Sequence, residues 1–394
     1  MEPEPQPEHA TAPYRRAQDD VPRPRDRVWV HAVWEALLAA AVVLAVLAVR
    51  SRDVGALSGD NLRSVLVSLA VGVLLGTAFA LSLRAAVPNL AVGTAAVTAG
   101  ALTGWLVADR GYSLLTAAMV TLGASVALGL GLAVVVIGFR APAWAAGLGA
   151  ALGLYAAVLA LTDGRSLLIH DAPDVRRWAW PVLGGALLLS VGGGVLGLLP
   201  GVRNGVGRYR PDGDPAAGRG ASAAFVAACA LVGSTVLAAT AGLLLSVRLG
   251  AVVADDGLTL LAQAAGAALL GGASAHGRRG GVVGTALAAA LLQLSAVWLG
   301  LVEARSWARP AVLGAAIVLG LLVGRLVEAA GSRRGDQPED FHPIPDEPDP
   351  YATETYPRYQ PGGYNQGSTY RADGDVWWNQ ASANSPSRSA SEAP

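Results

Sequence analysis

The chain has 394 residues, of which 53% are apolar and only 15% charged, and its net charge is zero. Soluble domains carry about 25% charged residues, so this is the composition of a membrane protein, and the balanced charge indicates no nucleic-acid partner. All 29 basic residues are arginines, which excludes a P-loop for ATP and a lysine nucleophile. The single cysteine, Cys229, excludes an intrachain disulfide and a multi-cysteine metal site.

The N-terminal region, residues 1–32, is rich in Pro, Glu and Arg, and we expect a disordered cytoplasmic tail. Several arginines precede the first apolar run, and no small-residue cleavage site follows that run. These features favour an uncleaved first membrane span over a signal peptide.

Apolar runs long enough to cross a bilayer then recur along the chain, and residues 33–328 are the predicted transmembrane domain. The predicted fold is therefore all-α, a polytopic membrane protein of about ten transmembrane helices with disordered tails. An even number of spans places both termini on one side, and the arginine-rich loops predict that this side is the cytoplasm. The expected spans are residues 33–50, 63–83, 87–108, 114–139, 141–162, 178–199, 221–247, 257–276, 280–302 and 309–328.

Residues 329–394 form a polar C-terminal region rich in Pro, Tyr, Ser and Asp, without apolar periodicity. We expect this region to be a disordered tail. Its tyrosines and tryptophans could recruit partners, but a solvated tail without a specific role is the stronger expectation.

Two apparent catalytic motifs are better explained as structure. The glycines of Gly192–Gly197 satisfy G-x-G-x-x-G but lie inside an apolar span, where a dinucleotide site has no preceding strand. Ser274 and His276 could be a nucleophile and a base, but residues two apart on a helix do not face each other. A tight turn with polar caps explains them better, and we expect neither catalytic residues nor a metal or cofactor site.

Few polar residues lie within the predicted spans, among them Asn89, Gln263 and Gln293. Such groups turn inward or line a path, because lipid offers no hydrogen bonds. Asn89 follows Pro88, which breaks a helix. Two interpretations stay open here: a broken helix inside the membrane, or a third span that starts at the interface.

Four motifs follow one another along the chain: Leu57–Leu62, Val87–Gly93, Phe139–Gly149 and Leu270–Thr285. In this order they resemble the permease subunit of the ribose/branched-chain amino acid class of ABC importers, most closely its sugar branch. The last motif, LGGASAHGRRGGVVGT, is the most specific and resembles that family's L-G-G-T-S-x-x-G-G-x-G-x-x-x-G-T.

The resemblance implies a permease that moves a small, sugar-like solute through the cytoplasmic membrane by alternating access. It implies a second permease chain as a homodimer or heterodimer partner, separate ATP-binding subunits and an extracellular solute-binding protein. ATP hydrolysis would then belong to a partner, so the chain itself would not be an enzyme.

The resemblance also assigns residues to roles. A substrate path would include Asn89, Gly93 and Gly147. The ATP-binding subunit would dock on Arg208, Ala216, Ala217, Arg219, Arg278 and Arg279. The family signature would be Gly271, Gly272, Ser274, Gly277, Gly280, Gly284 and Thr285.

The loop that would hold the family's coupling helix departs from its pattern. It is shortened and contains Pro211, Pro215 and several glycines, which are poor in a helix interior. This departure favours an alternative, a permease-fold membrane protein that has lost transport and serves as a structural or interaction protein.

Overall fold

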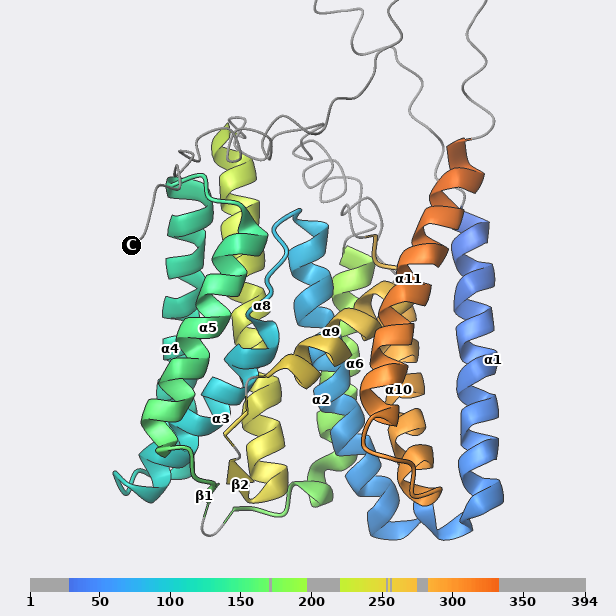
Figure 1. Cartoon of the computed structure of the whole chain (residues 1–394), viewed down its shortest axis with the longest axis horizontal. Coiled ribbons are helices and arrows are strands. Elements are labelled where there is room, and N and C mark those ends of the chain that lie inside the picture. The colour runs from blue at the N-terminus through green and yellow to red at the C-terminus, as the bar shows by residue number, and fades with distance from the viewer. Residues whose placement is uncertain are drawn as a thin grey trace, which may run out of the picture. The chain divides into compact units, whose positions relative to one another are not determined.

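In a computed structural model the chain forms a bundle of α-helices (Figure 1). The structure describes residues 28–169, 172–196, 220–252, 254–255, 257–274 and 283–332. The two predicted tails lie almost wholly outside these residues. The first helix begins at Val28 and the last ends at Ser332, so each extends a few residues beyond the predicted transmembrane domain, 33–328.

Helices occupy all ten positions at which the sequence predicts a span, which confirms an all-α, polytopic fold. They are α1 (Val28–Arg52), α2 (Gly59–Arg84), α3 (Val92–Ala108), α4 (Leu114–Ala133), α5 (Ala143–Thr162), α6 (Ala179–Leu196), α8 (Gly220–Leu249), α9 (Leu258–Leu270), α10 (Gly284–Leu301) and α11 (Ala308–Ser332).

Short elements complete the described chain. Val54–Leu57 (η1) and Val175–Trp178 (η3) are 3₁₀ turns, and Val134–Gly138 (η2) is a π-helical turn that extends α4. Strands β1 (Leu167–Leu168) and β2 (Ala251–Val252) pair antiparallel, with Leu167 opposite Val252. We call the end of the bundle where they pair the ladder end.

Eight helical segments in the described part of the chain are long and apolar enough to cross a membrane. Helices α3 and α9 are apolar but shorter, with 17 and 13 residues. A full span needs about 20 residues, so these two helices are too short to cross on their own. The expected third span (87–108) and eighth span (257–276) are thus each a shorter helix joined to non-helical chain.

Burial separates central from peripheral helices. In the most apolar stretch of α2, 67% of the residues are buried, whereas in the most apolar stretch of α1 only 11% are buried. Helices α1, α5 and α11 carry exposed leucines, and α1 and α11 also carry exposed valines, as expected where lipid is the solvent. Cys229, a small apolar residue that is usually buried, is exposed on α8.

Helices α2–α5 and helices α8–α11 pack in corresponding ways. Helix α8 contacts α2, α3 and α4, and α2 correspondingly contacts α8, α9 and α10. Helix α3 packs on α5, and α9 correspondingly packs on α11. Helix α3 ends against the strands at the ladder end, whereas α9 follows β2 and runs away from that end (Figure 1). Helices α2–α5 and α8–α11 therefore form two halves of inverted direction, an arrangement typical of transporters.

The two short helices begin against each other inside the bundle. Gly257 precedes α9 with φ +77°, and a Cβ atom there would lie 2.5 Å from the backbone nitrogen of Thr94. A Cβ atom on Gly93 would lie 2.5 Å from the nitrogen of Leu261. Only glycine permits this approach, because any side chain would overlap the opposite backbone.

Candidate functional site

The three residues assigned to a substrate path lie close together around the non-helical chain that leads into α3. Residues 85–91, which we call the first entry segment, carry Asn89, whose side chain is 1% exposed. Gly93 lies in the first turn of α3, against Gly257 and Leu261. A Cβ atom on Gly147 in α5 would lie 2.7 Å from the nitrogen of Leu90.

Asn89 stabilises the first entry segment through a closed set of hydrogen bonds. Its side-chain nitrogen donates to the hydroxyl of Ser234 on α8 at 2.7 Å, and its side-chain oxygen accepts from the backbone N–H of Ala91 at 3.1 Å. Its backbone N–H donates to the hydroxyl of Ser82 at 3.1 Å. Asn89 therefore lies in a broken, buried stretch of chain rather than at an exposed interface, and its polar groups are satisfied within the protein.

The turn that carries the family signature lies between α9 and α10. A Cβ atom on Gly271 would lie 2.5 Å from the nitrogen of Thr285, and Gly284 in turn contacts the carbonyl of Gly271. Gly272, with φ +90°, follows, and Ser274 and Thr285 are buried. The described glycines of the signature thus serve close packing of the two helix ends.

Two side chains of helix α1 form hydrogen bonds to the two ends of this turn. The indole nitrogen of Trp34 donates to the carbonyl of Leu270, the last residue of α9, at 2.8 Å. A carboxylate oxygen of Glu35 accepts from the backbone N–H groups of Val283 and Gly284 at 3.2 and 3.1 Å. A carboxylate at a helix N-terminus is favourable because the unpaired N–H groups carry partial positive charge.

The remaining assigned residues lie outside the described residues. They are Gly277 and Gly280 of the signature, and the predicted docking residues Arg208, Ala216, Ala217, Arg219, Arg278 and Arg279.

A cavity of about 570 Å³ lies between α2, α3, α8, α9, α10 and the start of α11. Its walls are largely apolar, with helix α3 contributing Ala96, Val97 and Gly100. This volume is typical of small-molecule sites, which combine apolar walls with a few polar groups. The polar residues in its lining include Arg248, Asp255, Thr259, Gln263, Gln293 and Arg309.

The cavity runs from the ladder end into the bundle. Asp255 and Arg309 at its rim are exposed, whereas the side chain of Gln263, within α9, is 7% exposed. The described residues of 250–257 (250–252, 254–255 and 257), which we call the second entry segment, lie between the rim and the start of α9. The predicted path residues Asn89, Gly93 and Gly147 do not line this cavity.

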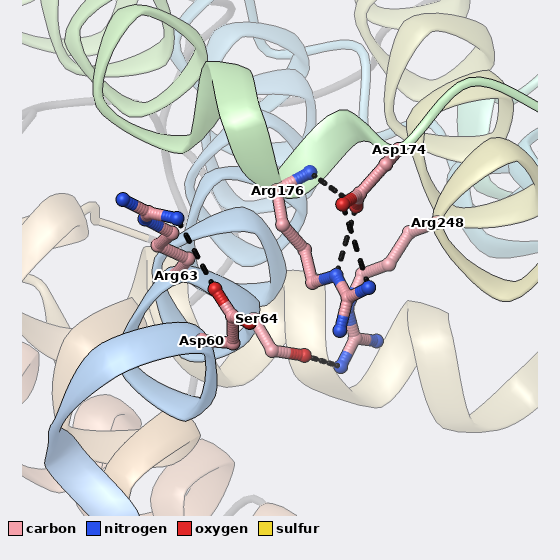
Figure 2. Close-up of polar contacts among 6 residues, drawn as sticks. All are labelled: Asp60, Arg63, Ser64, Asp174, Arg176 and Arg248. Carbon is pink, nitrogen blue, oxygen red and sulfur yellow. Dashed lines mark hydrogen bonds and ion pairs between the residues drawn. The ribbon is translucent and has the colours of Figure 1, made fainter.

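Arg248 stands out among the charged groups at this end (Figure 2). Arg63 pairs with Asp60 at 3.1 Å, and Arg176 pairs with Asp174 at 2.8 Å. Arg248 instead donates from Nη2 to the hydroxyl of Ser64 at 3.1 Å, and its buried Nε has no hydrogen-bond partner among the described residues.

Two carboxylates of this region, those of Asp174 and Asp255, have hydrogen-bond partners other than Arg248. The hydrogen bond from the Arg176 side chain holds the pKa of Asp174 below its ordinary value of 3.8. Asp255 accepts a hydrogen bond from the backbone N–H of Gly257 at 2.7 Å. Within the described chain, the guanidinium of Arg248 therefore faces the cavity without a carboxylate partner.

Sequence reasoning assigned none of these cavity residues to a site. Gln263 and Gln293 were visible as polar residues within apolar runs, and Arg248 as an arginine between two predicted spans. Their convergence depends on how α8, α9 and α10 pack. Among the described residues no group of three His, Cys, Asp or Glu side chains could hold a metal ion.

Comparison with known proteins found no matching protein-family model, no matching curated protein and no matching solved structure.

Proposed function

We propose that this membrane protein is a permease that moves a small solute by alternating access. The observation that carries the proposal is the meeting of two short, oppositely directed helices, α3 and α9, beside a cavity that reaches Gln263. Broken helices are tolerated at membrane depth where they are buried in protein or line a cavity. In transporters built from inverted halves, solute sites lie between such helices.

The four sequence motifs favour a particular form of this activity, the permease subunit of an ABC importer. In that form a second permease chain and two ATP-binding subunits complete the transporter, and an extracellular binding protein delivers a sugar-like solute. Both termini and the docking surface around Arg208, Arg219, Arg278 and Arg279 then face the cytoplasm. The ladder end, where the cavity has its exposed rim, then faces outward in the cytoplasmic membrane.

A second candidate function is that of a permease-like protein that has lost transport and serves as a structural or interaction protein. The packing of Asn89, Gly93 and Gly147 favours it, because all three lie against neighbouring backbone or side chains instead of lining the cavity. The Pro- and Gly-rich coupling loop supports it as well.

Partner association separates the two candidates. The tagged full-length chain is solubilised from its native membrane in a mild detergent, and ATPase activity is measured in the purified material. The importer proposal expects a co-purifying ATPase that is released by the double substitution Arg208→Ala and Arg219→Ala. Arg63→Ala is the control, because Arg63 lies at the ladder end and should not affect docking. Purification without any ATPase would contradict the importer proposal and favour the second candidate.

A further inference from the structure

We infer that the cavity binds the carboxylate or phosphate group of a small anionic solute, held by Arg248 and Arg309. The inference rests on the proposed function in so far as the bound anion is the transported solute. It deepens that proposal by specifying that the solute, which the sequence motifs suggest is sugar-like, carries an anionic group.

The first step is charge. Arg248 and Arg309 line the cavity with one described carboxylate, Asp255, so the described lining carries a net positive charge of one, from two cations and one anion. The neighbouring arginines at this end, Arg63 and Arg176, are each neutralised by an aspartate (Figure 2). Arg248 and Arg309 thus leave a net positive charge in the described cavity lining, whereas Arg63 and Arg176 are paired with aspartates.

The second step is hydrogen bonding. The buried Nε of Arg248 lacks a partner among the described residues, and a buried donor without a partner is unfavourable. Because the Arg248 side chain also lines the cavity, its guanidinium can donate other N–H groups to an anionic oxygen there. Guanidinium groups bind carboxylate and phosphate groups through two parallel hydrogen bonds, so Arg248 suits this ligand class better than a neutral sugar.

The third step is position. Ser64 binds Nη2 of Arg248 and so helps to orient the guanidinium at the edge of the cavity. Gln263 and Gln293 provide side-chain amides in the lining of the same cavity, and helix α3 provides part of its apolar wall. An anionic group at Arg248 would therefore leave the rest of a small solute among amides and apolar side chains, as in typical ligand sites.

Binding is tested by calorimetry on the detergent-purified full-length chain. The anionic probes are inorganic phosphate, succinate and glucose 6-phosphate, and glucose is the neutral probe. We expect at least one anionic probe to bind and glucose to bind more weakly or not at all. Arg248→Gln should weaken anion binding about tenfold to a hundredfold, because hydrogen bonds to charged groups contribute about 1.5–3 kcal/mol.

Two further variants distinguish a loss of anion binding from misfolding of Arg248→Gln. Arg309→Gln alters an exposed side chain at the rim and should weaken binding of the same probe several-fold without disturbing the bundle. Arg63→Gln is the matched control, since Arg63 lies at the same end but does not line the cavity. Absence of binding by every anionic probe, or equal binding in wild type and the Arg248 and Arg309 variants, would overturn the inference.

A phospholipid headgroup carries the same phosphate chemistry, and native mass spectrometry distinguishes the two sources. Phospholipid retained by the wild type and lost in Arg248→Gln would overturn the assignment to a small solute. The binding assay needs no ATPase and no transport, so its failure is separate from that of the proposed function. Anion binding without a co-purifying ATPase would leave the inference standing and contradict the importer.

Discussion

The two entry segments both place non-helical chain inside the helix bundle, but their polar groups are arranged differently. Each brings non-helical chain into the bundle and ends where α3 or α9 begins. In the first, Asn89 is fully buried and its side chain is hydrogen-bonded to Ser234 on α8 and to the backbone N–H of Ala91. In the second, Asp255 is exposed, binds the N–H of Gly257 and lines a cavity with Arg248.

The difference separates a structural role from a binding role. In the first entry segment, which packs against Gly147 of α5, the side chain of Asn89 is hydrogen-bonded within the protein. The second entry segment lies beside a cavity that Arg248 lines without a carboxylate partner among the described residues. Two inverted halves thus need not contribute equally to a binding site. Here the half formed by α8–α11 carries the charged and amide groups of the candidate site.

The largest effect is expected where the two segments meet. Gly257→Ala should destabilise the protein by about 3 kcal/mol, because a Cβ atom would overlap the backbone of Gly93 and Thr94 at a positive φ. The measurement is the melting temperature and the yield of monodisperse protein in detergent. The control is Gly250→Ala, which also has positive φ but no atom within 4 Å, and it should lose only about 1 kcal/mol. Equal effects of the two variants would contradict a packed contact between α3 and α9.

A smaller loss of stability is expected from opening the first entry segment. Asn89→Ala removes two side-chain hydrogen bonds and leaves the buried N–H of Ala91 without its acceptor, so the free energy of unfolding should fall by about 2 kcal/mol. Calorimetric binding of anions should stay unchanged. Asn61→Ala is the control, because Asn61 makes an exposed bond to the carbonyl of Gly55. A loss of anion binding in Asn89→Ala would place a solute path in the first entry segment after all.

The charge of the second entry segment should modulate binding without affecting the fold. Asp255→Asn keeps an oxygen that can accept from the N–H of Gly257 but removes a negative charge from the cavity rim. Removing that repulsion, about 1 kcal/mol for partly exposed charges, should tighten phosphate binding about fivefold. Asp163→Asn is the control, since this exposed aspartate pairs with Arg165 and does not line the cavity. Unchanged affinity in Asp255→Asn would argue against an anion near the rim.

The smallest effect concerns acid stability beside the cavity. Arg176 lowers the pKa of Asp174 in the folded protein below the ordinary value of 3.8. This pair therefore stabilises the protein fully at pH values above 3.8. That stability is lost only as the pH falls through the lower, folded pKa. Asp174→Asn should therefore flatten the dependence of melting temperature on pH below about pH 4. An identical acid profile in wild type and variant would show that the pair is not maintained in solution.

Hydropathy predicted the helices well because each membrane-buried segment needs a long apolar run. It could not show that the helices of the third and eighth runs are short, because the non-helical residues 87–91 and 271–274 lie inside the predicted spans. Pro88 and Asn89 signalled one break, but Gly257, which marks the other, is one of 49 glycines. The cavity depends on contacts between residues as far apart as Ser64 and Arg248. Such contacts follow from helix packing and leave no local pattern in the sequence.

The bonds from α1 to the α9–α10 turn have a consequence for how the chain is made. Trp34 and Glu35 are synthesised early, but their acceptor and donors, at Leu270 and at Val283 and Gly284, follow 236 to 249 residues later. At the usual 5–20 residues per second this delay is about 10–50 s. During that time α1 is inserted with a carboxylate that lacks its final partner, so its docking against α10 must be one of the last steps of biogenesis. A chain truncated before α10 should therefore leave α1 undocked and open to quality-control proteases of the membrane.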